Sequence, residues 1–405
     1  MTPLKLILHI GTEKTGTTHL QNLMVSNENI LKKEGIHLLA CAGIGNNRKL
    51  PSYCLENGNF DEYLRSINVT NEQIKDEFDL NLEKDLESEI NSLDGNINTV
   101  VISSEHFHSR VQTTPEIQKG YNLFKKYFGQ IELVCYLREQ ASVCQSSYST
   151  SIRSGSTTPL NEYMSWCNTS NSYFDYLSFI SKWKEVYIEE NLNINVYEKS
   201  RFLNQDLVVD FFSKLKPGLE KKISKSITKS NESLNNLGQL LSLAINQTIP
   251  KETANGSLNP AFSNVFEIIN SYFSGSDNLL SQEQYDKIFF HFYDDNVQLN
   301  KLLFNSNAPL FEYTPPISEN FDDYSDNKNR AKAISGLVKL ITTLNSSTFQ
   351  PNYSDGDLLR DIALEYEERD LKKSLSLMLL ASRFKPNGQF IRDKIVEIEE
   401  KLSNQ

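Results

Sequence analysis

The chain has few cysteines, and none of them is spaced as a pair. Its five cysteines are odd in number and form no C-x-x-C motif (Cys41, Cys54, Cys135, Cys144 and Cys167). Disulfide frameworks and structural zinc sites both depend on paired cysteines. The sequence therefore predicts free thiols in a reducing compartment, and we expect a cytoplasmic protein.

Long apolar runs are also lacking. The apolar stretch LKLILHI, residues 4–10, is too short for a membrane span and is followed at once by polar residues. It therefore does not have the pattern of a signal peptide or of a transmembrane helix. Because no other long apolar run follows, we expect no membrane span.

Positive charge is in the minority. The 405 residues include 41 Lys and Arg against 52 Asp and Glu, a formal net charge of −11. This balance disfavours a general nucleic-acid or anionic-membrane binder, although it allows a local basic site. A hydrophobic fraction of 39%, with 18 Tyr and 22 Phe, is ample for a packed core. The length predicts a large domain with an appendage.

Short apolar runs alternate with amphipathic segments in the first half of the chain. Buried strands and helices that follow one another in this way are typical of an open, mostly parallel α/β sheet with right-handed crossovers. The predicted fold is therefore α/β, with a P-loop-like central parallel sheet flanked by helices. The predicted strands are 4–10, 99–103, 131–137 and a run from Ile194, and the predicted helices include 17–34, 117–128 and 173–187.

The rest of the chain is mainly helical in pattern. The sequence predicts a main domain over 1–317, a polar linker over 318–330 and a small all-helical region over 331–405. Apolar residues between Leu359 and Ala381 form two amphipathic faces that resemble one tetratricopeptide-type hairpin. Such a hairpin would suit a protein partner or self-association, and a helical cap with no binding role explains the pattern equally well.

The segment GTEKTGTT, residues 11–18, has the glycine spacing of a phosphate-binding loop. Gly11 and Gly16 are separated as in a nucleotide-triphosphate P-loop, where lysine directly follows the second glycine. Here Thr17 occupies that position, and Lys14 lies two residues before Gly16. The loop thus has the right context between a strand and a helix, but a displaced lysine.

Donors in this loop suit an anion. The amides of Gly16, Thr17 and Thr18 can point at a phosphate from the start of the helix, and the hydroxyls of Thr15, Thr17 and Thr18 add donors without adding charge. The strand VVIS at 100–103 offers no terminal aspartate for magnesium. The sequence therefore predicts a phosphate site that needs no metal.

Two segments carry a family resemblance. HIGTEKTGTTHLQ (9–21) and YLREQASVCQSSY (136–148) resemble the donor-binding elements of sulfotransferases, which use 3′-phosphoadenosine 5′-phosphosulfate (PAPS) and release adenosine 3′,5′-bisphosphate (PAP). The resemblance covers roughly 4–313 and is to bacterial members that act on surface polysaccharides. It implies that Arg138 and Ser146 hold the 3′-phosphate and that the acceptor is a glycan.

The chemistry of such a transfer gives the displaced lysine a purpose. Negative charge develops on the oxygen that bridges sulfur and phosphorus, and Lys14 can stabilise it. The animal cytosolic sulfotransferases have an R-K-G segment that contributes to the contacts with the donor's 3′-phosphate and adenine. This segment has no clear counterpart in the present sequence. The region of Lys225, Lys229, Ser230 and Asn231 could replace it, although a solvated lysine-rich helix is the simpler interpretation.

One general base is still needed to deprotonate the acceptor. Glu105, His106 and His108 follow the strand 99–103, and the resembling families use either Glu or His. We expect Glu105 to be the base, because alternation sends its neighbour His106 to the opposite face. A structural role for Glu105, as a partner of Arg110 or a helix cap, is the alternative.

Three functions remain open at this point. The leading prediction is a PAPS-dependent sulfotransferase acting on a hydroxyl acceptor without a metal. A P-loop kinase would need ATP and magnesium, and the position of Lys14 disfavours it. A non-catalytic interaction protein that works through its helical C-terminus is the third.

Overall fold

A computed structural model describes most of the chain. The described residues are 3–188, 190–225, 234–253, 257–275, 278–316, 336–337, 339–341, 353–367, 370–385 and 388–403. The chain divides into two compact units, one of Met1–Lys251 with Phe273–Asn329 and one of Glu252–Tyr272 with Arg330–Gln405. The predicted linker 318–330 lies outside the described residues, so the predicted domain boundaries stay a prediction.

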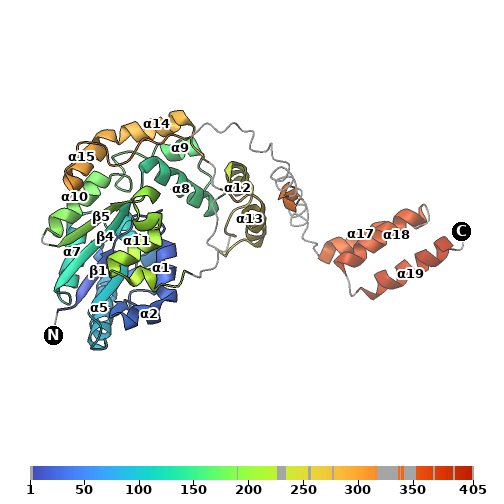
Figure 1. Cartoon of the computed structure of the whole chain (residues 1–405). Helices are drawn as coiled ribbons and strands as arrows, with labels where there is room; N and C mark the ends of the chain where they lie inside the picture. Colours follow the sequence, from blue (N-terminus) through green and yellow to red (C-terminus); the bar gives the residue numbers. More distant parts are fainter. Residues whose placement is uncertain are drawn as a thin grey trace. The chain divides into compact units, whose positions relative to one another are not determined.

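The first unit is built on a five-stranded sheet whose strand pairs are all parallel (Figure 1). The strands are arranged in the order β2-β3-β1-β4-β5, so β1 lies at the centre. This confirms the predicted α/β class and the parallel sheet. The strands are β1 (Lys5–His9), β2 (Ile36–Leu38), β3 (Thr99–Ser103), β4 (Gln130–Leu137) and β5 (Asn191–Val196).

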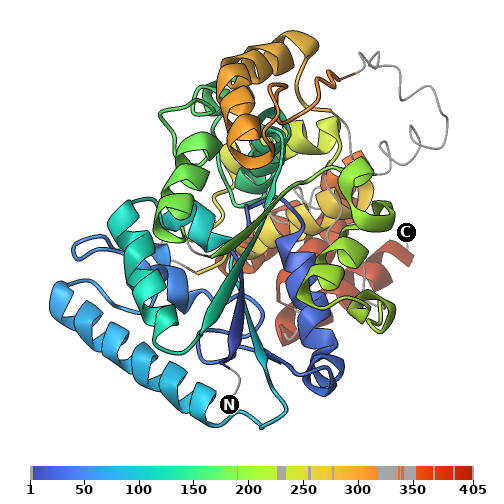
Figure 2. The same cartoon turned by 60° about the vertical axis from the view of Figure 1, so that its left-hand side comes forward.

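Both faces of the sheet are covered, which explains the nearly continuous apolar runs in its inner strands β1, β3 and β4. Along β1, Leu6 and Leu8 enter one hydrophobic core, whereas Ile7 between them enters the other. The first core includes residues of α3 (Lys49–Cys54), α5 (Glu72–Asn91), α6 (His106–Arg110), α7 (Thr114–Lys125), α10 (Tyr176–Val186), α14 (Gln282–His291) and α15 (Tyr293–Phe304). The second includes residues of α1 (Thr17–Ser26), α2 (Glu28–Lys33) and α11 (Leu207–Leu215), which lie across the sheet from α7 and α10 (Figure 2).

Further helices complete the first unit. The helix α8 (Gln140–Arg153) follows β4 and carries Ser146. The other elements are α4 (Glu62–Ser66), α9 (Leu160–Met164), α12 (Asn236–Thr248), and the 3₁₀ turns η1 (Lys199–Arg201), η2 (Leu203–Gln205) and η3 (Leu219–Lys221).

The helix predicted over 17–34 is two helices, and Asn27 is where they separate. Its side-chain nitrogen donates to the carbonyl oxygens of Leu23 at 2.9 Å and Ser224 at 3.1 Å. Its side-chain oxygen accepts from the Ser224 amide at 2.9 Å. A distant segment thus holds Asn27, and no periodicity along 17–34 could reveal that contact.

The second unit is helical in its described parts. It contains α13 (Pro260–Tyr272), α17 (Tyr353–Tyr366), α18 (Leu371–Phe384) and α19 (Gln389–Ser403). The last three helices share a small apolar core that includes Ala363, Met378 and Ile391. This confirms the helical C-terminal region, whereas its likeness to a tetratricopeptide repeat stays a prediction. None of the helices in the described ranges is long and apolar enough to cross a membrane.

Candidate functional site

Three predicted elements meet at the carboxyl ends of the central strands. In the parallel register, His9 at the end of β1 pairs with Ser103 of β3 and with Val134 of β4. The loop 11–16 follows β1, Glu105 follows β3 and Arg138 follows β4. Ligand crevices of open α/β sheets form at this edge, so the topology brings the predicted donor and base residues together.

The two glycines of the loop are required by its geometry. Gly11 has φ 95° and Gly16 has φ 76°, both in the left-handed region that favours glycine. A Cβ atom on Gly11 would lie 3.0 Å from the Cα atom of Glu105, and one on Gly16 would lie 2.8 Å from Cδ2 of Leu207. The loop therefore packs closely against Glu105 on one flank and against α11 on the other.

Hydrogen bonds to β4 hold the loop in place. The backbone nitrogen and the hydroxyl of Thr12 both donate to the Tyr136 carbonyl at 3.0 Å, and the Tyr136 amide donates to the Gly11 carbonyl at 2.8 Å. The hydroxyl of Thr15 donates to the Thr12 carbonyl at 2.6 Å. Thr15 is therefore committed to the loop itself, which differs from the expectation that its hydroxyl donates to a ligand.

The start of α1 retains the character of an anion site. The helix begins at Thr17, and its N-cap residue, Gly16, supplies no side-chain cap. The first amides of a helix have no partner within the helix, and the helix dipole favours negative charge there. Thr17 is buried and Thr18 is exposed, so Thr18 is the threonine whose hydroxyl is open to a ligand.

Cationic side chains converge on this loop from β4 and α8. The guanidinium Nη1 of Arg138 donates to the main-chain carbonyl of Lys14 at 2.9 Å. Burial, together with the charges of Arg138 and Arg153, lowers the pKa of Lys14, whereas Glu13 and Glu105 oppose that shift. An anion bound between these like charges would be favoured.

Ser146 reaches the same group through the backbone of α8. The Lys14 ammonium donates to the hydroxyl of Thr150, and this hydroxyl donates to the Ser146 carbonyl at 3.1 Å. Ser146 therefore lies one helical turn from the partner of Lys14. The structure thus joins the two predicted donor motifs, although they are more than 120 residues apart in sequence.

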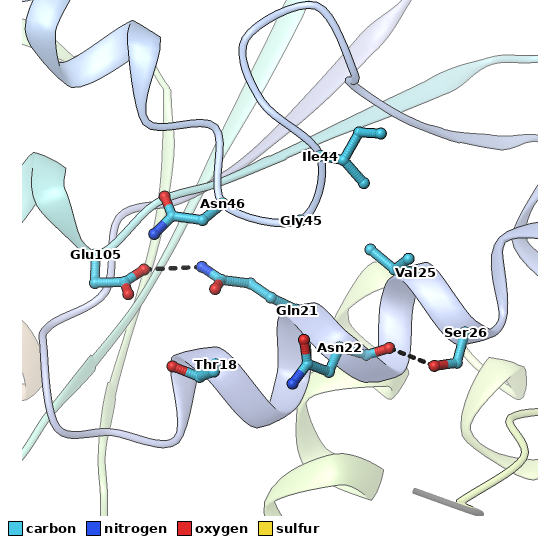
Figure 3. A pocket seen from close by; sticks show the side chains of 9 residues that line it. All are labelled: Thr18, Gln21, Asn22, Val25, Ser26, Ile44, Gly45, Asn46 and Glu105. Atoms are coloured by element: carbon cyan, nitrogen blue, oxygen red, sulfur yellow. Dashed lines mark hydrogen bonds between the residues drawn. The ribbon is translucent and has the colours of Figure 1, made fainter. Parts of the chain in front are cut away.

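Glu105 is free of the two structural roles that could have explained it. It precedes α6 as the N-cap residue, but its side chain makes no cap hydrogen bond. Arg110 instead pairs with Glu62, with Nη2 2.8 Å from Oε1. The Oε2 atom of Glu105 accepts from the amide nitrogen of Gln21 at 2.8 Å (Figure 3).

Strand alternation does not separate Glu105 from its neighbour His106, because β3 ends at Ser103 and α6 begins at His106. The Nδ1 atom of His106 lies 3.9 Å from Oε1 of Glu13, and the Oε2 atom of Glu13 accepts from the Tyr173 hydroxyl at 3.0 Å. Burial and the charge of Arg48 lower the pKa of His106, so the ring is held toward its neutral form. His106 therefore remains a chemically reasonable alternative base.

His108 is part of the core. Only 1% of it is exposed, and its ring packs against Tyr173, Tyr176 and Phe179 at centroid distances of 4.9, 6.0 and 5.0 Å. Burial lowers its pKa to about 4. In this structure His108 is shielded from any bound acceptor, which agrees with the preference for Glu105.

Sequence reasoning missed several residues of the site. Gln21 contacts Glu105, and Glu13 lies near His106. Thr150 accepts a hydrogen bond from Lys14, and the charge of Arg153 acts on the same lysine. One signal was present: Gln21 follows Thr17 by four residues, so both lie on the same face of α1 and point into the protein. Glu13 meets α6 and Tyr173, and Arg153 of α8 acts on the distant Lys14, so neither residue left a local signal.

The replacement proposed for the R-K-G segment has little to support it. The ammonium of Lys225 lies 2.5 Å from Oδ2 of Asp206, the N-cap of α11. Lys225 therefore serves a structural ion pair. Lys229, Ser230 and Asn231 lie outside the described residues. Within the described part of the chain, no group of three or more His, Cys, Asp or Glu side chains is arranged to hold a metal ion.

Comparisons with known proteins give distant likenesses. No protein-family model matches the sequence. An uncharacterized protein of Archaeoglobus fulgidus is 29% identical over 118 residues, which are 29% of this chain and 31% of that protein. The chain thus spans about a third of the length of this curated relative. A solved sulfotransferase from Alicyclobacillus acidocaldarius is similar with a TM-score of 0.34 and 13% identity, over 61% of this chain and 93% of that one.

Proposed function

We propose that the protein transfers a sulfuryl group from PAPS to a hydroxyl of an acceptor, with a glycan as the acceptor class. The observation that carries this proposal is the bond from the Arg138 guanidinium to the Lys14 carbonyl, 2.9 Å long. It joins the phosphate-binding loop to the arginine that the sequence motif assigns to a second phosphate. A donor with phosphate groups at both ends of a ribose suits two linked anion sites.

Each phosphate of the donor has suitable protein groups in this arrangement. The amides at the start of α1 and the hydroxyl of Thr18 would bind the 5′-phosphosulfate. Arg138 would bind the 3′-phosphate together with Ser146, and Arg153 adds positive charge to the same region. Gly16 lacks a Cβ atom, so the backbone can approach the anion closely.

The transfer itself needs only a base and a cation. The acceptor oxygen would form a bond to sulfur while the bond from sulfur to the bridging oxygen breaks. The proton of the acceptor hydroxyl would pass to Glu105, with His106 as the alternative base. Lys14 would stabilise the charge that develops on the bridging oxygen. We expect no metal to be needed.

Thermal unfolding with different ligands tests this proposal. PAP at 100 times its Kd should stabilise the full chain by about 2.7 kcal/mol, because it binds only the folded state. ATP with magnesium, at the same concentration, should stabilise it much less. A larger effect of ATP with magnesium would favour a kinase instead. No effect of either ligand would favour a non-catalytic interaction protein.

Transfer from labelled PAPS to hydroxyl compounds is the second part of the test. Labelled product that depends on both donor and acceptor would support the enzyme. If PAP binds and no hydroxyl compound is ever labelled, the site binds the nucleotide without catalysing transfer.

A further inference from the structure

A pocket of about 510 Å³ opens directly beside Glu105 (Figure 3). Its volume falls within the range of small-molecule sites, roughly 300–1,000 Å³. Three parts of the chain form it: one face of α1, the loop after β2, and Glu105, two residues after β3. The lining residues are Thr18, Gln21, Asn22, Val25, Ser26, Ile44, Gly45, Asn46 and Glu105.

The pocket is continuous with the proposed donor site. Thr18 belongs both to the pocket lining and to the anion-binding start of α1. Glu105 lines the pocket and also lies against Gly11, where an added Cβ atom would be 3.0 Å from its Cα atom. A molecule in the pocket can therefore present an atom to the reacting group and to Glu105 at once.

The lining chemistry selects a class of ligand. Of the nine lining residues none is Lys, Arg or His, and the only formal charge is the carboxylate of Glu105. An acceptor that carried a carboxylate or phosphate here would be unpaired and repelled by Glu105. The side-chain amide of Asn22 can both donate and accept hydrogen bonds. The hydroxyl of Ser26, which donates to the Asn22 carbonyl at 2.7 Å, can still accept one, and both groups match the hydroxyl groups of a sugar.

Several of these groups are already fixed in position. The Gln21 amide nitrogen donates to Glu105 at 2.8 Å and to the hydroxyl of Ser103 at 3.3 Å. The side-chain oxygen of Asn46 accepts from the Ser104 hydroxyl at 2.8 Å, so its amide nitrogen can donate to a ligand. Fixed polar groups lose little freedom when a ligand binds, and they orient it.

The pocket also has an apolar wall. Val25 of α1 and Ile44 of the loop face each other across it (Figure 3). Their side chains are 38% and 76% exposed, respectively. This wall suits the C–H face of a sugar ring, which an inorganic anion or a small charged acceptor lacks.

We propose that this pocket is the acceptor site and that it takes a neutral sugar, with one hydroxyl held at Glu105. This inference rests on the proposed function for its chemical step. The acceptor oxygen bonds to sulfur, the bond from sulfur to the phosphate oxygen breaks, and the proton moves to Oε1 of Glu105, because Gln21 holds Oε2.

The experiment fills the pocket without touching its charge. Val25→Trp in the full chain should raise the KM for neutral methyl glycosides at least tenfold, while the Kd for PAP stays within about twofold. Leu80→Trp, which also introduces a tryptophan at an exposed position, here in α5, is the control and should alter neither value. Ile44→Trp, on an exposed loop, gives a second variant if Val25→Trp does not fold.

The substrate class is tested with matched sugars. Methyl glycosides of neutral hexoses should be labelled at least tenfold faster than the corresponding uronic acids, which differ by one carboxylate. A preference for the uronic acids would overturn the neutral class, and a wild-type KM in both tryptophan variants would place the acceptor elsewhere.

Direct binding separates this inference from the proposed function. Saturation-transfer NMR with the same neutral glycosides reports occupancy without any transfer reaction. If PAP does not bind but glycoside signals are present and vanish in Val25→Trp, the proposed function is wrong and the sugar pocket stands. If PAP binds and the glycoside signals are absent or unchanged in the variants, the function survives and the pocket proposal is overturned.

Discussion

Two carboxylates act on Lys14, and their surroundings differ. Both Glu13 and Glu105 work to raise the pKa of that lysine. Glu105 lines an open pocket, and a neutral amide holds one of its oxygens. Glu13 instead lies among His106, Tyr173 and other buried polar groups.

The difference assigns the two carboxylates different tasks. Burial raises the pKa of Glu13, whereas the hydroxyl of Ser109 and the neighbouring histidines lower it. The lowering effects are together larger, so the net pKa lies below its ordinary value. A carboxylate held ionised by its partners is a poor proton acceptor and a good structural anchor. Proximity to the lysine alone therefore does not identify the base. Under the proposed function, the open pocket favours Glu105.

The sharpest way to break this comparison is to neutralise each carboxylate in turn. Glu105→Gln keeps the shape of the side chain and removes its basicity, so single-turnover transfer should fall by roughly 10²- to 10⁴-fold with PAP affinity intact. Glu13→Gln should lower it by less than about tenfold. The comparison would be reversed if Glu13→Gln were the inactive variant. Loss of transfer in His106→Ala, with Glu105→Gln still active, would make the histidine the base.

Removing Lys14, on which both carboxylates act, should have the next largest effect. Lys14→Ala should reduce turnover about 100-fold, close to 3 kcal/mol of transition-state stabilisation, while the circular dichroism spectrum and melting temperature show an intact fold. Lys33→Ala, an exposed lysine at the end of α2, is the matched control. Unchanged turnover in Lys14→Ala would leave the loop a simple anion clamp.

Arg138 belongs to the proposed donor site, where neither carboxylate takes part, so its replacement tests donor binding separately from the base. If it binds the 3′-phosphate, Arg138→Ala should weaken PAP binding roughly 10- to 100-fold in calorimetry, the range of a charged hydrogen bond. Adenosine 5′-phosphosulfate lacks that phosphate and should lose much less. Arg65→Ala, on the exposed face of α4, is the control. Equal losses for both ligands would mean that Arg138 only supports the loop.

The smallest expected effect is on stability. It concerns His108, a buried neighbour of Glu13. His108 has a folded-state pKa of about 4 against 6.5 in the unfolded chain, so the unfolded state binds more protons between these values. Stability should therefore fall as the pH drops from 7 to 5, by about 2 kcal/mol from this residue. The lowered pKa of Glu13 acts only below its unfolded value of 4.5, outside that window.

Urea unfolding of the wild type and His108→Phe at pH 7 and pH 5 measures this contribution. The variant should lose about 2 kcal/mol less than the wild type over the same interval, whatever its absolute stability. Equal losses would show that His108 can be protonated in the folded protein. Burial lowers the pKa of His9 to about 4 as well. Because both proteins retain His9, its contribution to the pH dependence cancels in their comparison.

Features set by neighbouring residues in sequence could be predicted, and those set by distant contacts could not. The strand 99–103 and the loop between Gly11 and Gly16 follow from local apolar runs and glycine spacing. The break at Asn27 depends on Ser224, and the pocket beside Glu105 depends on the loop at Asn46. Such contacts arise only when the sheet order is fixed, and no residue pattern encodes them locally.

Under the proposed function, the bond between Arg138 and the Lys14 carbonyl would link the two phosphate sites thermodynamically. Lys14 has φ 66°, so its backbone is held in a conformation that a lysine rarely adopts. Under the proposed function, an arginine engaged by the 3′-phosphate would reinforce that conformation and aim the ammonium group at the leaving group. By reciprocity, the two sites share one coupling free energy. Discrimination against a donor without the 3′-phosphate would then appear in kcat as well as in affinity, because the remote 3′-phosphate would help to activate transfer of the sulfuryl group.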